Sequence, residues 1–249
     1  MAGRDVTADR LVRCGAAAGP LFVCVFLVEG ARRPAYSPLR HPVSSLAFGP
    51  RGWVQVANFA LAGTLYVAGA AGLALMPTAR GGDRLGAATF AATGIGLLGS
   101  ALFSTDPVSD YPPGTPDVPA GTLHNLSALP IFLGIPAGAL AYAWRFHRRG
   151  EHAWALYSAA AGVSVPVAIG LASAGFSQSP HLVDFAGLLQ RVAIVTGLGW
   201  LTAVSARALA ATPRNARCSV GREGSGHRRA PVVVARVVSS RRGTDRPHR

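Results

Sequence analysis

The sequence contains no lysine, and all 24 of its basic residues are arginine. Charged residues make up only 14% of the chain, against about 25% in a typical soluble domain. This deficit argues against a soluble globular protein and favours one that is surrounded by lipid. The combination of abundant alanine, glycine and arginine with no lysine is typical of proteins from GC-rich bacterial genomes.

Cysteine is also scarce, and the familiar catalytic motifs are missing. Cys14, Cys24 and Cys218 have neither zinc-site nor redox-motif spacing, so no disulfide framework or structural metal is expected. The chain has no G-x-S-x-G elbow, phosphate-binding loop, kinase signature or HExxH motif. A G-x-G-x-x-G match at Gly94 lies within an apolar run rather than after a strand, so it does not indicate a dinucleotide site. No cofactor is therefore expected.

Long apolar runs dominate what is present. Each is about twenty residues long, the length of helix that crosses the roughly 30 Å hydrocarbon core of a bilayer. We therefore predict an all-α fold, a polytopic bundle of six transmembrane helices. The predicted spans are residues 14–31, 53–76, 85–103, 123–144, 153–175 and 185–211.

The arginines predict how the chain lies in the membrane. The sequence divides into a segment over residues 1–13, a six-helix domain over 14–211 and a basic tail over 212–249 that reads as disordered. Alternate connections and both terminal segments, together with Arg207, hold 19 arginines, and the opposite side holds 5. The positive-inside rule then places both termini in the cytoplasm of a multi-pass cell-membrane protein. Membrane lipids are the expected partners, and nucleic acid is not.

Polar residues gather near the predicted outer ends of spans two, four and six. Ionisable and amide side chains at membrane depth usually face the bundle interior or a wet cavity. Gln55 and Asn58 are three residues apart and share one helical face. The candidate site is therefore a polar cluster formed by His41, Ser44, Gln55, Asn58, Asp106, His124 and Arg191.

Three stretches of this polar region also resemble a known family. The longest reads His41-Pro-Val-Ser-x-Leu-x-x-Gly-x-x-Gly-Trp-x-Gln-x-x-Asn-Phe-x-x-x-Gly63, and the others are Thr105-Asp106-Pro107 and Gly121-x-Leu-His124. Together they resemble the bacterial membrane family called domain of unknown function 998. The resemblance implies a six-span architecture and implies no chemistry.

Three interpretations of the polar cluster remain open at this stage. It can be a binding or transport site for a small molecule or lipid, with Arg191 meeting an anionic group. It can be a metal-dependent hydrolase in which His41, Asp106 and His124, with His181 as an additional candidate ligand, hold zinc and activate water. It can also be purely structural, since unpaired polar groups are costly in lipid. Whether the protein is an enzyme, which ligand it takes and whether it forms oligomers stay undetermined.

Arg191 gives the sharpest structural expectation. It falls inside span six among Leu188, Leu189, Val192 and Ala193, where an unpaired charge is unfavourable. Asp106 emerges from span three on the same side of the membrane. We therefore predict an Arg191–Asp106 ion pair, or a shared water network, that closes the outer mouth of the bundle.

Overall fold

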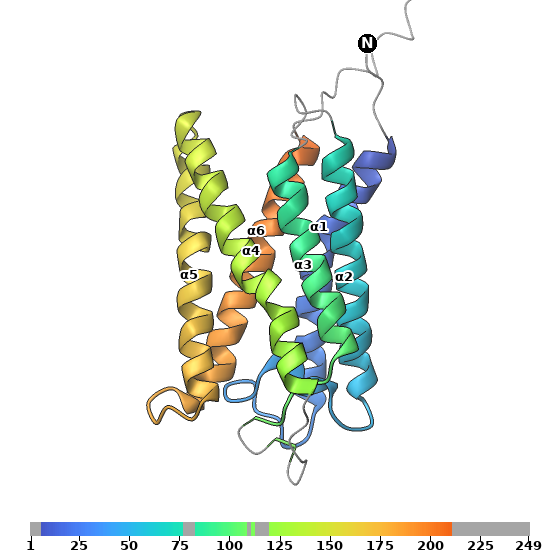
Figure 1. The fold of residues 1–249 in the computed structure, drawn as a ribbon, viewed down its shortest axis with the longest axis vertical. Coiled ribbons are helices and arrows are strands. Elements are labelled where there is room, and N and C mark those ends of the chain that lie inside the picture. The colour runs from blue at the N-terminus through green and yellow to red at the C-terminus, as the bar shows by residue number, and fades with distance from the viewer. Residues whose placement is uncertain (1–5, 77–82, 109–110, 113–119, 211–249) are drawn as a thin grey trace, which may run out of the picture. The chain divides into compact units, whose positions relative to one another are not determined.

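The computed structural model describes residues 6–76, 83–108, 111–112 and 120–210. The predicted tail over 212–249 lies outside these residues. The long helices are α1 (Val6–Arg32), α2 (Gly52–Leu75), α3 (Arg84–Leu102), α4 (Ala120–Arg148), α5 (His152–Phe176) and α6 (Ala186–Ala210), with short 3-10 turns η1 (Val43–Ala47) and η3 (Val183–Phe185). All six long helices are long and apolar enough to cross a membrane. The predicted all-α, six-span fold is confirmed (Figure 1).

The predicted span limits agree with the helices to within one residue except in α1 and in α4, which extends three residues before and four residues beyond its predicted span. Helix α1 begins at Val6 rather than Cys14, so residues 6–13 of the predicted N-terminal segment are helical. The additional turns carry the buried residues Ala8 and Val12, which explains why the helix starts before the continuous apolar run. The α2–α3 connection includes residues 77–82, which lie outside the described part of the chain.

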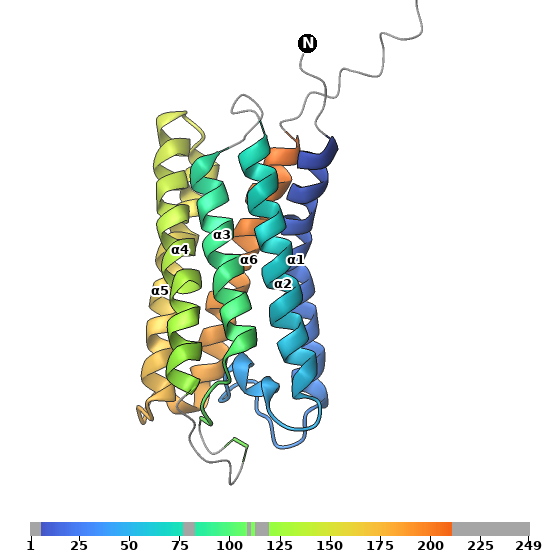
Figure 2. The same cartoon turned by 45° about the vertical axis from the view of Figure 1, so that its right-hand side comes forward.

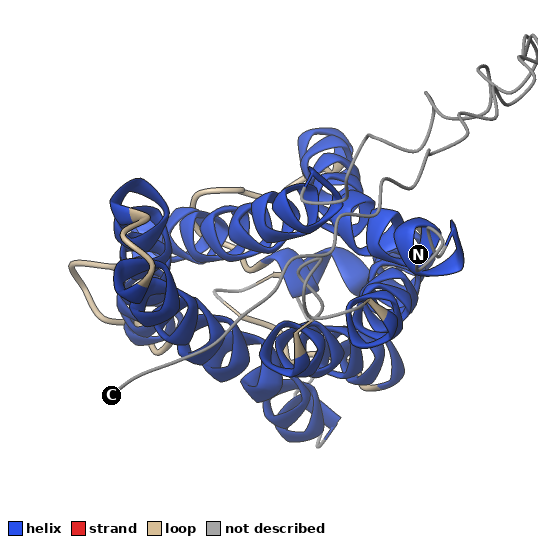
Figure 3. Ribbon diagram, turned by 90° about the horizontal axis from the view of Figure 1, so that it is seen from above, coloured by secondary structure: helices blue, strands red, loops and turns tan. Residues whose placement is uncertain are grey.

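The helices form a closed ring in chain order. Each packs on the helix before and after it, and α6 packs back on α1 (Figure 3). Contact across the ring is slight and involves α4 and α6. One end of the bundle, which we call the terminal end, carries the start of α1, the end of α6 and the α4–α5 turn (Figure 2). The opposite end, the loop end, carries the α1–α2, α3–α4 and α5–α6 connections.

Glycines allow the closest approaches in this ring. A Cβ built on Gly63 of α2 would lie 2.8 Å from the backbone oxygen of Gly94 on α3. Likewise, a Cβ on Gly15 of α1 would lie 3.0 Å from the Cα of Gly69 on α2. In lipid, where apolar contact alone drives little association, such backbone proximity provides the dispersion contacts that hold helices together. Larger side chains at these positions would separate the helices.

The half of the bundle towards the terminal end is filled by aromatic side chains. The Tyr66 and Phe90 ring centroids are 5.7 Å apart, and those of Tyr142 and Trp200 are 5.5 Å apart, both in edge-on geometry. Trp200 is fully buried, and its indole Nε1 donates a hydrogen bond to Ser158 Oγ at 3.0 Å. These rings, together with Phe146, close the centre of the ring at this end.

Candidate functional site

The α1–α2 connection folds inward at the loop end and is held there by arginine. Val43, Ser44 and Leu46 of η1 are buried. The Arg33 guanidinium donates hydrogen bonds to the carbonyl oxygens of Leu46, at 3.0 Å, and of Phe48. The Arg33 guanidinium also lies 3.6 Å from the buried Glu29 carboxylate. This connection is therefore part of the folded core.

Arg191 holds the same connection from the α6 side. Its guanidinium donates to the carbonyl oxygens of His41, at 3.1 Å, and of Gly187, at 2.9 Å, and also to the Tyr36 hydroxyl. The Tyr36 hydroxyl in turn donates to the Pro42 carbonyl oxygen at 3.0 Å. Burial raises the pKa of Tyr36, which therefore stays neutral and remains a donor. Arg191 thus fixes the connection through oxygens that carry no formal charge.

The predicted Arg191–Asp106 ion pair does not form among the described residues, whereas the alternative, a shared water network, stays a prediction. Among the described residues, the ion pairs at the loop end join Glu29 to Arg33 and Arg51, and Arg40 to Asp184. Asp106 instead lies against Gly121 in the first turn of α4, so closely that a Cβ on Gly121 would meet its carboxylate at 1.9 Å. The partial positive charge of a helix N-terminus favours a carboxylate at this place. Two carbonyl oxygens and the Tyr36 hydroxyl accept from the Arg191 Nη atoms, whereas Arg191 Nε and Asp106 Oδ1 are buried without a hydrogen-bond partner among the described residues.

Gln55 and Asn58 face the bundle interior, as predicted. They are 0% and 3% exposed. The Asn58 side-chain amide donates to the Phe22 carbonyl oxygen of α1 at 3.1 Å and to Gln55 Oε1 at 3.4 Å. This pair therefore ties α2 to α1 and does not line an open space.

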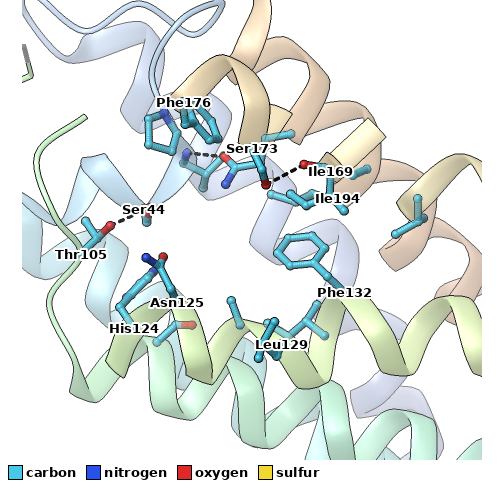
Figure 4. Close-up of a pocket in the computed structure, with 18 of the residues that line it drawn as sticks. Ser44, Thr105, His124, Asn125, Leu129, Phe132, Ile169, Ser173, Phe176 and Ile194 are labelled. Atoms are coloured by element: carbon cyan, nitrogen blue, oxygen red, sulfur yellow. Dashed lines mark hydrogen bonds between the residues drawn. The ribbon is translucent and has the colours of Figure 1, made fainter. Parts of the chain in front are cut away.

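The half of the bundle towards the loop end contains a cavity of about 590 Å³. All six long helices contribute to its wall, together with Pro42, Val43 and Ser44 of the α1–α2 connection and Thr105 and Val108 after α3. Figure 4 shows side chains from several of these segments pointing towards one another across it. The cavity has the size of a small-molecule site, which is typically about 300–1,000 Å³.

Polarity changes along the cavity. Ser44, Thr105, His124, Asn125 and Gln190 lie at its loop-end side. The deeper wall is apolar and includes Leu129, Phe132, Ile135, Ile169 and Ile194. On α4, His124 and Ile135 both line the cavity, and their separation along the helix is about 16 Å at 1.5 Å per residue. Among the described lining residues, none is aspartate, glutamate, arginine or lysine.

The cavity reaches the outside of the ring between α4 and α5. Its wall includes Leu129 and Leu133 of α4, which are 47% and 65% exposed. On α5, Gly170 also lines the cavity, and a Cβ added there would meet no atom within 4 Å. Towards the terminal end the same two helices touch, since a Cβ on Gly162 would lie 2.7 Å from Leu140. The two helices therefore diverge towards the loop end, as Figure 1 shows, and leave a side opening at membrane depth.

The ring nitrogen of His124 that carries the hydrogen can be assigned from its hydrogen bond. Its Nδ1 lies 2.8 Å from the Phe103 carbonyl oxygen. A carbonyl oxygen can only accept, so Nδ1 carries the hydrogen, and in the neutral ring Nε2 then carries a lone pair. The Ser44 hydroxyl donates to Thr105 Oγ1 at 3.4 Å nearby (Figure 4). The polar end therefore offers both donors and an acceptor.

The structure divides the seven predicted site residues into two groups. Ser44 and His124 line the cavity, whereas His41, Gln55, Asn58, Asp106 and Arg191 are absent from its lining. His41 Nδ1 accepts from the Ser37 backbone N–H at 2.9 Å, and its ring stacks on Tyr111 with centroids 4.9 Å apart. No three His, Cys, Asp or Glu residues among those described come close enough to hold a metal ion. The predicted zinc ligands do not assemble into a site.

Sequence reasoning missed two kinds of residue around the cavity. Tyr36 of the α1–α2 connection packs edge-on against Tyr111 with ring centroids 5.4 Å apart, and neither residue has a recognisable motif. Phe132 and Ile169 form the apolar wall, but in sequence they look like any lipid-facing residue. The sequence could reveal this wall only to a reader who already knew that α4 packs against α5.

One comparison with known proteins is informative. The family model described as "Protein of unknown function (DUF998)" matches residues 16–207. The chain belongs to this family. The matched segment includes every residue that lines the cavity, from Phe22 to Leu198. No curated protein and no solved structure matches the chain.

Proposed function

We propose that this protein binds an amphipathic, lipid-like molecule within the membrane. The observation that carries the proposal is the cavity, which is polar at the loop end, apolar below and open sideways between α4 and α5. An amphiphile in the bilayer already has its head near the interface and its chain in the core. It can therefore enter through the side opening without leaving the membrane. Binding of this kind serves storage, sensing or movement of the ligand across the bilayer.

The lining supports binding more than hydrolysis by a metal. Apolar walls with a few convergent polar groups are the usual composition of small-molecule sites. The candidate zinc ligands are held elsewhere, His41 by Ser37 and Tyr111, and Asp106 at the start of α4. A structural role explains the Gln55–Asn58 pair well, but it does not explain an unfilled space of about 590 Å³.

A photocrosslinking experiment tests this function. The full chain in nanodiscs is exposed to monooleoylglycerol that carries a diazirine on its acyl chain, and crosslinked residues are mapped by mass spectrometry. We expect labelling at the deep wall, around Phe132, Ile169 and Ile194.

A pair of matched variants provides the control. Ala128 lines the cavity, so Ala128→Phe should fill it and remove the labelling. Ala137 lies on the same helix, is exposed and lies outside the lining, so Ala137→Phe should leave the labelling intact. Equal labelling of both variants, spread over lipid-facing residues, would reject the cavity as a binding site.

We also propose that the terminal end faces the cytoplasm of a bacterial cell membrane. The support is the arginine asymmetry, together with the arginines of the α4–α5 turn, Arg145, Arg148 and Arg149. In a variant without Cys14, Cys24 and Cys218, a cysteine at Ser179 should react with an impermeant thiol reagent on intact cells. A cysteine at Gly150 should react only after lysis, and the reverse pattern would invert the protein.

A further inference from the structure

We infer that the occupant is a lipid with one acyl chain and an uncharged head that carries a free hydroxyl, the chemistry of a monoacylglycerol. This inference rests on the proposed function and names its ligand class. Three properties of the cavity lead to it: its size, the absence of charge in its described lining, and the lone pair of His124.

Size selects a single chain. At about 30 Å³ per water molecule, a cavity of about 590 Å³ holds the equivalent of roughly 20 waters. That is the scale of one acyl chain with a small head. A two-chain phospholipid has roughly twice as many non-hydrogen atoms and would have to leave one chain outside, between α4 and α5.

The lack of charge in the lining selects a neutral head. A phosphate or carboxylate that entered would lose its hydration and meet no cation among the described lining residues. Arg191 is the cation nearest in sequence to a lining residue, but its guanidinium already donates hydrogen bonds to Tyr36 and to the His41 and Gly187 carbonyls. The Arg191 side chain is buried and absent from the lining, so it does not compensate an anion in the cavity.

His124 selects a head that donates a hydrogen bond. Its Nδ1 hydrogen is given to Phe103, which leaves Nε2 as an acceptor at the polar end. Gln190 Oε1, a second acceptor there, is already engaged by the Val43 backbone N–H at 2.8 Å. A ligand hydroxyl can donate to His124 Nε2 and accept from Thr105 or Asn125, which also line this end. An ester oxygen can only accept and would leave Nε2 unpaired.

Competition against the diazirine-bearing monooleoylglycerol tests the head group. Unlabelled monooleoylglycerol, methyl oleate, oleic acid and oleoyl lysophosphatidylcholine share one acyl chain and differ in the head. We expect monooleoylglycerol to compete best and methyl oleate to compete about fivefold to tenfold more weakly, the effect of one hydrogen bond. Oleic acid and lysophosphatidylcholine should compete more weakly still, because each brings a charge.

Two substitutions at His124 separate recognition from folding. In His124→Asn the side-chain amide can still donate to the Phe103 carbonyl, but nothing replaces Nε2. Its melting temperature should stay near that of the wild type, while the advantage of monooleoylglycerol over methyl oleate disappears. His124→Gln places an amide near the position of Nε2 and should restore part of that advantage.

Each outcome separates this inference from the proposed function. Equal competition by all four lipids would keep the cavity as a chain-binding site and overturn the neutral, hydroxyl-bearing head. Stronger competition by oleic acid or lysophosphatidylcholine would also overturn it, in favour of a charged head. An unchanged preference in His124→Asn would overturn the role of Nε2. If no lipid competes and Ala128→Phe labels like the wild type, the proposed function itself fails.

Discussion

The two halves of this bundle are built from the same six helices, but the centre of the ring is packed differently in each half. Towards the terminal end, Tyr66 packs edge-on against Phe90 and Tyr142 packs edge-on against Trp200, and all four rings are buried. Towards the loop end, Phe22, Phe26 and Phe59 also pack together, and this half contains in addition the α1–α2 connection and the cavity. A ring in which helices touch mainly their neighbours needs filling from within, and the two halves fill it differently.

The two halves also differ in the partners of their arginine side chains. Near the terminal end the arginines pair with carboxylates, Arg145 with Asp83 and Arg207 with Glu151, at partly exposed positions. At the loop end Arg33 and Arg191 are buried and bind backbone carbonyls. Partly exposed ion pairs contribute little free energy, whereas buried hydrogen bonds to charged groups contribute more. Hydrogen bonds from buried arginine side chains therefore contribute mainly to the half that contains the cavity.

The largest effect expected from this comparison is at Trp200. Trp200→Ala removes a fully buried ring and leaves Ser158 without its donor, so the free energy of unfolding should fall by about 3–5 kcal/mol. Phe132→Ala, at the wall of an existing cavity, should lower it by less than about 1 kcal/mol. Denaturant titration of both variants in micelles measures the difference. Similar losses for the two would mean that the loop-end half is packed as tightly as the other.

The next effect concerns the polar network at the loop end. Arg191→Met keeps an apolar stem but leaves the Tyr36 hydroxyl and the His41 carbonyl without their charged donor. We expect a loss of about 2–3 kcal/mol in the free energy of unfolding, from the same titration. Arg40→Met, at an exposed pair with Asp184, is the matched control and should change little. Equal effects of the two substitutions would show that the burial of Arg191 does not increase its contribution to the free energy of unfolding.

A smaller effect tests the side opening. Gly170→Phe places a ring at the gap between α4 and α5, and it should reduce labelling by the monooleoylglycerol probe about tenfold, or roughly 1.4 kcal/mol. Gly199→Phe is the control, because Gly199 also has no atom within 4 Å of an added Cβ but does not line the cavity. Normal labelling of the Gly170 variant would place the entrance elsewhere.

The smallest expected effect is a coupling close to zero. Arg191 and Asp106 have separate partners, so the losses of Arg191→Gln and Asp106→Asn should add within about 0.5 kcal/mol in the double variant. Asp106→Asn alone should cost about 0.3–1 kcal/mol, the usual effect of a charge at a helix N-terminus. A coupling above about 1 kcal/mol would restore the ion pair that the sequence suggested.

The architecture could be predicted from the sequence because length and hydropathy alone define a span. The inward direction of Gln55 and Asn58 could also be predicted, since a shared face of two amides must be satisfied inside a bundle. Ser44 and His124 were found because polar residues at helix ends are few in such an apolar chain. Each of these inferences uses residues close together in sequence.

The partner of Arg191 and the cavity itself could not be predicted in this way. Arg191 binds Tyr36, which lies 155 residues earlier, and two backbone carbonyl oxygens. Every residue has a backbone carbonyl, so no sequence pattern indicates which of them an arginine will bind. Reasoning restricted to carboxylate partners therefore selected Asp106. The wall of Phe132, Ile169 and Ile194 escaped notice for a related reason, because lipid and an apolar cavity favour the same side chains.

The closed ring has a consequence for connectivity. Helix α6 packs on α1, and an even number of spans brings the start of α1 and the end of α6 to the same end of the bundle. The chain could therefore begin at a different helix of the ring and still give every helix the same two neighbours. A chain joined from the end of α6 to the start of α1, and reopened at the exposed Gly150 turn, would begin with α5 and end with α4. Such a circular permutant should insert with the same sidedness and re-form the cavity from helices synthesised in a new order.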